Sequence, residues 1–196
     1  DHVLGPTWEQ IHGLGPVIPE GGPPWWQGRR VELEQIAREH GCAYVYDRAT
    51  FERTARQLLA IGGVERVFYA IKANPHPDIL RSFAALGLAF ECVSQGECER
   101  VIETIPGIDR QKILFTPNFA PRSEYEWALE QGVNLTIDNV YAWREWGELF
   151  RDRDVLIRID TGFGRGHHDH VRTAGVHSKF GVPLFEMDEV ERLVNL

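Results

Sequence analysis

The sequence predicts an α/β fold of parallel strands, either an incomplete (β/α)8 (TIM) barrel or an open doubly wound sheet. Strand-like and helix-like runs alternate with a period of about 22 residues, and Gly or Pro breaks most of the junctions. Strand–helix–strand units of this length imply parallel strands joined by right-handed crossovers. Only five alternations are present, so a barrel would have about five of its eight strands.

Each element is expected from the periodicity of its apolar residues. The expected strands are Val67–Ile71, Leu88–Val93, Ile113–Thr116, Val133–Ile137 and Val155–Asp160. The expected helices between them are Ala49–Ile61, Pro77–Leu86, Gly96–Thr104, Arg122–Glu130 and Val140–Phe150, with a last helix over Glu186–Leu196. The first strand–turn–helix lacks a glycine-rich phosphate-binding motif, which weakens the dinucleotide-binding version of the fold.

Three regions are expected. Residues 1–30, rich in Gly, Pro and Trp, form an irregular lead-in or linker, because their Pro-Gly pairs prevent a continuous helix. Residues 31–48 contain a short helix, Val31–Glu39, and a strand at Tyr44–Tyr46. Residues 49–196 form the incomplete barrel. The chain begins at Asp1 instead of Met, so we expect a processed protein or part of a longer polypeptide.

Composition excludes several classes of function. A net charge of −8, with both signs interspersed, leaves no basic block for nucleic acid or an anionic membrane. No apolar run approaches the length of about 18 residues that a membrane span needs. The three cysteines, Cys42, Cys92 and Cys98, are odd in number and lack CxxC spacing. Reduced thiols and a cytoplasmic protein are therefore expected.

Lys72 is the residue most indicative of chemistry. It is one of only three lysines among 21 basic residues, and it ends the apolar run Val67–Ile71. A cation in that position is costly unless it is paired, neutral or used covalently. Unlike a guanidinium, an amine can lose its proton and form an imine with an aldehyde. The alternative is a strand-end lysine whose amine reaches out to water.

Polar residues also end two other expected strands. Side chains alternate along a strand, so Ala70 shares a face with Lys72, and Leu156 shares one with Arg158 and Asp160. Glu91 lies near the end of its strand. An amine, a carboxylate and a guanidinium thus meet where α/β sheets and barrels bind their ligands. Salt bridges at the barrel rim are the alternative.

A glycine-rich loop, Gly162–Gly166, follows the fifth strand and leads into a cluster of His and Asp residues, His167–His170. Such a cluster could suggest a metal loop, but no second group of ligands accompanies it. We therefore expect an active-site loop that contacts a ligand, and no metal.

With these residues in place, the chain resembles the pyridoxal phosphate (PLP)-dependent decarboxylases of the alanine-racemase-like barrel class, and among them the diaminopimelate decarboxylases. The matching motifs, in family order, are Tyr44–Asp47, Tyr69–Asn74, Glu91–Glu97, Val155–Asp160, Gly162–His167 and Ser178–Gly181. They cover about residues 40–183. The resemblance implies a PLP-binding barrel in which the Tyr44 strand pairs into a separate β-domain.

The resemblance also implies roles for individual residues. Lys72 would hold PLP as a Schiff base, with Ala70, Asn74, Arg158 and His167 near the cofactor. Glu91 would lie beside the lysine and the ring, where the family usually has aspartate, one methylene shorter. Ser178 and Lys179 would belong to a loop close to the substrate. The family's phosphate-binding glycine loop falls beyond residue 196, so we expect this chain alone to turn over little.

The implied reaction is decarboxylation of meso-diaminopimelate to lysine by a cytoplasmic homodimer, conceivably fused to an aspartate kinase. Its substrate is a small amino acid, and no nucleic acid or membrane is involved. Three alternatives stay open. One is arginine, ornithine or carboxynorspermidine decarboxylase, or a racemase, on the same fold. Another is a non-catalytic PLP-binding regulatory protein, and the last is a structural domain without a cofactor.

Overall fold

The computed structural model describes residues 24–162 and 179–194, and the chain divides into two units, residues 1–53 and 54–196. In the first unit, a 3-10 helix, η1 (Trp25–Arg29), leads into α2 (Arg30–His40), within one residue of the expected helix. Helix α3 (Arg48–Leu59) crosses the boundary between the units. The domain division expected at residues 30 and 48 stays a prediction.

The strand expected at Tyr44–Tyr46 is wrong. Residues 43–47 have no regular secondary structure, and the side chain of Tyr44 is 93% exposed. A β-strand is stabilised by hydrogen bonds to a neighbouring strand. Among the residues that the structure describes, none pairs with this segment, so β-prone side chains alone do not make it a strand.

The second unit alternates strands and helices. Its strands are β1 (Phe68–Ala70), β2 (Ala89–Cys92), β3 (Ile113–Phe115), β4 (Asn134–Ile137), β5 (Leu156–Ile157), β6 (Ile159–Asp160) and β7 (Val182–Pro183). Its helices after α3 are α4 (Pro77–Leu86), α5 (Gln95–Thr104), α6 (Arg122–Gln131), α7 (Val140–Trp146) and α8 (Met187–Val194), with short 3-10 turns η2 (Ile71–Ala73), η3 (Arg110–Lys112), η4 (Gly147–Phe150) and η6 (Leu184–Glu186). The expected alternation is confirmed.

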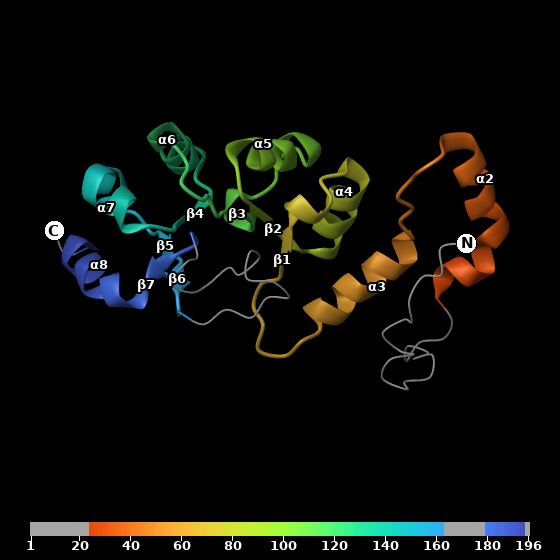
Figure 1. Cartoon of the computed structure of the whole chain (residues 1–196), viewed down its shortest axis with the longest axis horizontal. Helices are drawn as coiled ribbons and strands as arrows, with labels where there is room; N and C mark the ends of the chain where they lie inside the picture. Colours follow the sequence, from red (N-terminus) through yellow and green to blue (C-terminus); the bar gives the residue numbers. More distant parts are fainter. Residues whose placement is uncertain (1–23, 163–178, 195–196) are drawn as a thin grey trace, which may run out of the picture. The chain divides into compact units, whose positions relative to one another are not determined.

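All strand pairs are parallel, and the sheet runs in chain order from β1 to β5. Helices α4 to α8 lie on one side of the strands (Figure 1). Strands in chain order, each followed by a helix on the same side, are the arrangement of a (β/α) barrel and not of a doubly wound sheet. The fold is therefore α/β with the parallel sheet of a partial barrel.

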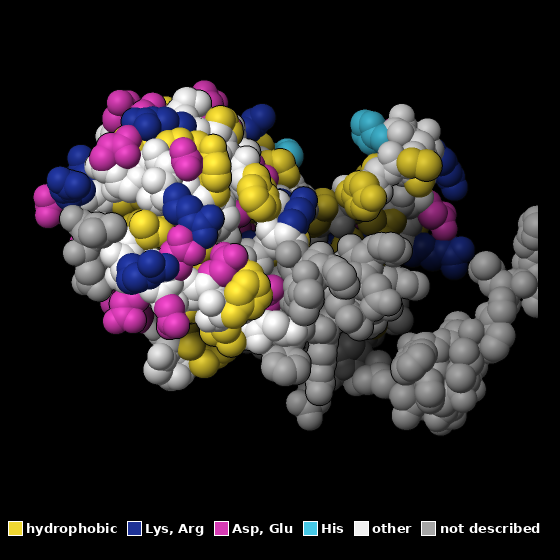
Figure 2. Space-filling model, turned by 60° about the vertical axis from the view of Figure 1, so that its left-hand side comes forward, with side chains coloured by type: hydrophobic (Ala, Val, Ile, Leu, Met, Phe, Trp, Pro, Cys, Tyr) yellow, Lys and Arg dark blue, Asp and Glu magenta, His cyan; other side chains and the backbone are white. Residues whose placement is uncertain are grey.

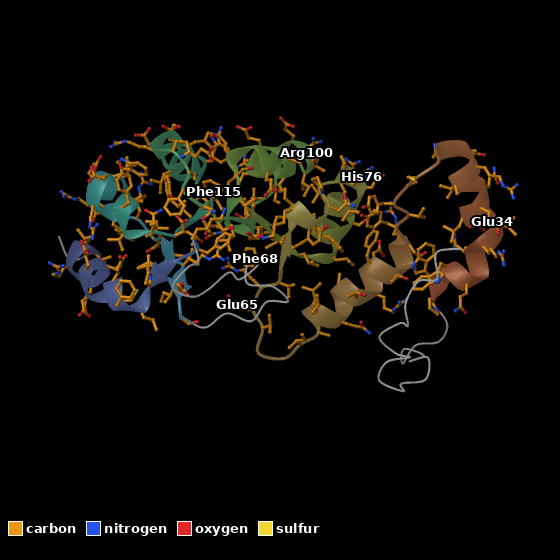
Figure 3. The ribbon with its side chains drawn as sticks, in the orientation of Figure 1. Glu34, Glu65, Phe68, His76, Arg100 and Phe115 are labelled. Atoms are coloured by element: carbon orange, nitrogen blue, oxygen red, sulfur yellow. The ribbon has the colours of Figure 1, made fainter. Side chains whose placement is uncertain are left out.

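The two faces of the sheet differ in burial. Tyr69, Phe90 and Ile113 form one row of register partners, and the last two are completely buried against the helices. The neighbouring row is Ala70, Glu91, Leu114 and Asn134, all half-buried. Figure 3 shows Phe115 on the helix side of the strands and Phe68 on the other. The helix side is the hydrophobic core, and the other face corresponds to a barrel interior.

The fifth strand differs from the expected continuous run. It is interrupted at Arg158, whose N–H donates to Ile137 O at 2.9 Å while its carbonyl accepts from Val182 N at 2.7 Å. Arg158 thus connects β4 on one side with β7 on the other. The sequence analysis missed β7, because two residues that include Pro183 carry almost no strand pattern. With β7, the arc of strands extends one position further.

One face of the described surface carries charged side chains of both signs. Figure 2 shows Lys and Arg side chains interspersed with Asp and Glu over the face formed by α6, α7 and α8. One ion pair on this face, Arg144 Nε to Glu189 Oε1 at 2.5 Å, joins α7 to α8 and lowers the pKa of Glu189. Within residues 24–162 and 179–194, no helix is both long and apolar enough to cross a bilayer.

Candidate active site

Lys72 lies just past the C-terminal end of β1, in the turn η2. The predicted strand Val67–Ile71 ends directly before Lys72, and the observed β1 ends one residue earlier, at Ala70, where the chain turns. The Tyr69 hydroxyl donates to Asn74 O at 3.2 Å, and His76 N donates to Asn74 Oδ1 at 2.9 Å, which closes the turn. Ile71 is fully buried while Lys72 is exposed. Asn74, expected near the cofactor, is thus seen shaping the turn that presents Lys72.

Glu91 lies beside this turn. Its register partner on β1 is Ala70, two residues before Lys72, so Glu91 is on the interior face at the same end of the sheet. Its carboxylate accepts a hydrogen bond from the hydroxyl of Thr116, the residue that follows β3. Within the described residues Glu91 forms no ion pair with Lys72. The sequence analysis had placed Thr116 in a strand and given it no role in the site.

Arg158 reaches the same end of the sheet from the junction of β5 and β6. Its guanidinium lies 4.6 Å from the centre of the Phe180 ring, and Lys179 Nζ lies 5.3 Å from that ring. An aromatic face holds a cation in this range. The residue that ends β6, Asp160, is buried and accepts from Gly162 N at 2.9 Å. Arg158 and Lys179 therefore both lie close to the ring of Phe180.

Asp138 is a buried carboxylate that sequence reasoning missed. It follows β4 directly, is 1% exposed, and accepts from Phe119 N and the Tyr125 hydroxyl, each at 3.3 Å, and from Asn139 Nδ2 at 2.8 Å. Burial, and then the negative charge of Asp138, raise the pKa of Tyr125 well above its usual range. Phe119 has φ of +55°, which is unusual for a residue with a side chain.

Asn118 connects this carboxylate to Lys179. With the Asn118 amide oriented to donate to Asp138 Oδ2 at 3.3 Å, its oxygen accepts from Lys179 Nζ at 3.3 Å. Asn118 and Asp138 come just after β3 and β4. Polar residues that directly follow buried parallel strands are the signal by which they could have been found.

The strand ends carry an amine after β1 and charged groups of both signs after the other strands. Lys72, Arg158 and Lys179 supply three cations, while Glu91 and Asp138 supply carboxylates that are held by hydrogen bonds. The Cys92 thiol, next to Glu91 in the sequence, is unsuited to nucleophilic work, because a hydrogen bond to Cys98 and then burial raise its pKa. Of the other expected residues, Ala70 lies half-buried beside Glu91, whereas His167 and Ser178 lie outside the described residues.

Two hollows lie away from these groups. One of about 210 Å³ on the interior face is lined by Phe68, Leu114, Asn134 and Leu156 and by Glu65 and Arg66. A larger one of about 990 Å³ lies between η4 and α8, near Val155 at the start of β5. The lining of this larger hollow includes none of Lys72, Glu91, Asp138, Arg158 and Lys179. Parallel barrels bind ligands at the C-terminal ends of their strands, so we place the site there and not in the larger hollow.

Comparisons with known proteins show the family of the chain. The family described as "Pyridoxal-dependent decarboxylase, pyridoxal binding domain" matches residues 48–196. A diaminopimelate decarboxylase of Methanothermobacter thermautotrophicus is 32% identical over 165 residues, which cover 81% of this chain and 38% of that protein. One from Pseudomonas fluorescens is 32% identical over 181 residues, 87% of this chain and 42% of that protein.

Solved structures give the same result. A crystal structure of diaminopimelate decarboxylase aligns with a TM-score of 0.71 and 28% identity, over 84% of this chain and 39% of that one. The Helicobacter pylori enzyme complexed with L-lysine aligns with a TM-score of 0.67 and 25% identity, over 81% and 41%. The chain thus spans about two fifths of the length of these relatives. It belongs to the pyridoxal-dependent decarboxylases, and its residues 48–196 match their pyridoxal-binding domain.

Proposed function

We propose that this chain forms the cofactor-binding part of a PLP-dependent decarboxylase that converts meso-diaminopimelate to lysine. The observation that carries the proposal is Lys72, an exposed amine just past the C-terminal end of β1, with Glu91 on the neighbouring strand opposite Ala70. The relatives that match most of this chain are named for the same reaction. A solved relative is complexed with L-lysine, the product of that reaction.

The residues present fit an aldehyde that carries a phosphate. An amine that can condense with the aldehyde is Lys72, which makes no hydrogen bond or ion pair within residues 24–162 and 179–194. Arg158 and Lys179 are cations that can attract the anionic groups of cofactor or substrate. Lys72 and Glu91 are the residues that would hold the cofactor near its reactive carbon.

When bound, PLP supplies an electron sink for the pair of electrons that stays behind as the substrate α-carboxylate leaves as CO2. Lys72 is the residue whose amine would hold the cofactor through its aldehyde. The cations Arg158 and Lys179 orient the carboxylates of a dicarboxylic substrate. To complete the reaction, the carbon that has lost CO2 must take up one proton. The carboxylate of Glu91, on the strand next to β1, is held by the hydroxyl of Thr116 and forms no ion pair with Lys72 within the described residues.

The test measures CO2 release by the native protein that contains these residues, supplied with PLP. Release from meso-diaminopimelate in preference to L-ornithine, L-arginine and L-lysine is the expected result. Preference for one of the other amino acids would assign the protein to another decarboxylase of this fold. A PLP-dependent spectrum that no amino acid changes would instead support a regulatory role.

For the 196-residue chain on its own, we predict little CO2 release from meso-diaminopimelate even when PLP is bound. The chain spans about two fifths of its relatives, and its described interior face leaves Phe68, Leu114 and Leu156 only partly covered. Single-turnover assays with radiolabelled carboxylate check this. Turnover by the isolated chain at the rate of the native protein would contradict it.

By the same resemblance we propose that the native protein acts as a homodimer in the cytoplasm. Free Cys42, Cys92 and Cys98 are consistent with a reducing compartment. Light scattering of the native protein gives its mass in solution, and a monomer that still decarboxylates its substrate would overturn the dimer.

A further inference from the structure

The hydroxyl of Thr116 is fixed in space by strand β2. Thr116 N donates to Cys92 O at 2.8 Å, and Thr116 Oγ1 lies 3.3 Å from the same carbonyl oxygen. A β-branched side chain has few χ1 rotamers, so the backbone anchor also fixes the side chain. This hydroxyl donates to Glu91 Oε1. The carboxylate of Glu91 is therefore drawn sideways along the sheet, toward β3.

Glu91 would otherwise lie within reach of Lys72. Its register partner is Ala70, two residues before Lys72, and both side chains are long and flexible. An ammonium and a carboxylate attract each other when they come within about 4 Å, and an exposed pair is worth up to about 1 kcal/mol. Within the described parts of the chain Lys72 and Glu91 form no such pair. The Glu91 carboxylate bonds to Thr116, and the amine of Lys72 has no partner.

We propose that Thr116 is a positioning residue that holds Glu91 toward β3 and so leaves the amine of Lys72 unpaired and reactive toward aldehydes. An amine must lose its proton before it attacks a carbonyl carbon, and a paired carboxylate stabilises the protonated form. The inference deepens the proposed function and rests on it, because Lys72 is the amine that would hold PLP.

The experiment measures the reactivity of Lys72 without any cofactor. The chain is treated with a limiting amount of acetic anhydride, and acetylation of its lysines is quantified by peptide mass spectrometry. Lys112, exposed in η3, is the internal reference. In Thr116→Val we expect the Lys72 to Lys112 acetylation ratio to fall about three-fold, the size of one exposed ion pair. Thr116→Ala, which removes the hydroxyl without putting a methyl group in its place, should give the same fall.

Two controls separate positioning from a general loss of structure. Thr116→Ser keeps the hydroxyl and should keep the wild-type ratio. The double variant Thr116→Val/Glu91→Gln has no carboxylate to capture the amine, and its ratio should return to the wild-type value. An unchanged ratio in both Thr116→Val and Thr116→Ala overturns the inference, and so does a fall that Glu91→Gln does not reverse. Failure of wild-type Lys72 to bind PLP would count against the proposed function alone.

Discussion

The Lys72→Ala variant is expected to lose all covalently held PLP. Lysine is the side chain whose amine condenses with the aldehyde, and the structure presents Lys72 in the turn after β1, exposed and beside Glu91. The wild-type chain should absorb near the visible edge once PLP is added and should keep the label after borohydride reduction. In Lys72→Ala, both signals should fall to background.

Two matched variants make this result specific. Lys72→Arg keeps the positive charge but cannot form the imine, so it should also lose the label. Lys112→Ala removes a lysine from η3, which precedes the N-terminal end of β3 and is not at the C-terminal end where Lys72 lies. This variant should bind PLP like the wild type. Covalent labelling that persists in Lys72→Arg would show that another amine binds the cofactor.

The Gly181→Ala variant is expected to lose about 3 kcal/mol of unfolding free energy. Gly181 has φ of +83°, and a Cβ there would lie 2.9 Å from Asp160 N and 3.1 Å from Arg158 O. A left-handed backbone costs a residue with a side chain roughly 1–2 kcal/mol, and overpacking adds about 1–3 kcal/mol. The clash is with backbone atoms, so no side chain can move aside. Urea denaturation of the chain measures the loss.

Gly132→Ala is the control that measures the cost of the left-handed backbone without any steric clash. Gly132 ends α6 with φ of +70°, but an added Cβ would meet no atom within 4 Å. We expect this variant to lose about 1 kcal/mol. Equal losses in the two variants would contradict the close approach of residue 181 to the Arg158–Asp160 segment.

This close approach also explains why one part of the fold could not be predicted. Arg158 bonds on one side to Ile137 and on the other to Val182, so its place depends on two segments that are distant in the sequence. Periodicity reports on local neighbours and gives no information on such pairing. The strands and helices from β1 to α7 were predictable, because apolar period and Gly or Pro junctions agree there. The strand predicted at Tyr44–Tyr46 is not observed, because a strand needs a neighbouring strand to pair with.

Some residues of the site could likewise be predicted from the sequence, and others could not. Lys72 and Arg158 could be chosen from the sequence, since a lysine after a buried strand and an arginine in one are costly and therefore informative. The roles of Thr116 and Asn118 could not be predicted from the sequence. Each of these residues acts through a side chain from a neighbouring strand end, Thr116 through Glu91 and Asn118 through Asp138. Their identity as polar residues after a strand was visible, but their partners were not.

The central claim is that one particular amine holds the cofactor, and peptide mapping of the wild-type chain tests it directly. The chain contains only three lysines, Lys72, Lys112 and Lys179, so the assignment is unambiguous. After incubation with PLP, reduction with borohydride and proteolysis, we predict the pyridoxyl group on the peptide that contains Lys72. A label found chiefly on Lys112 or Lys179, or spread evenly over all three, would contradict the account.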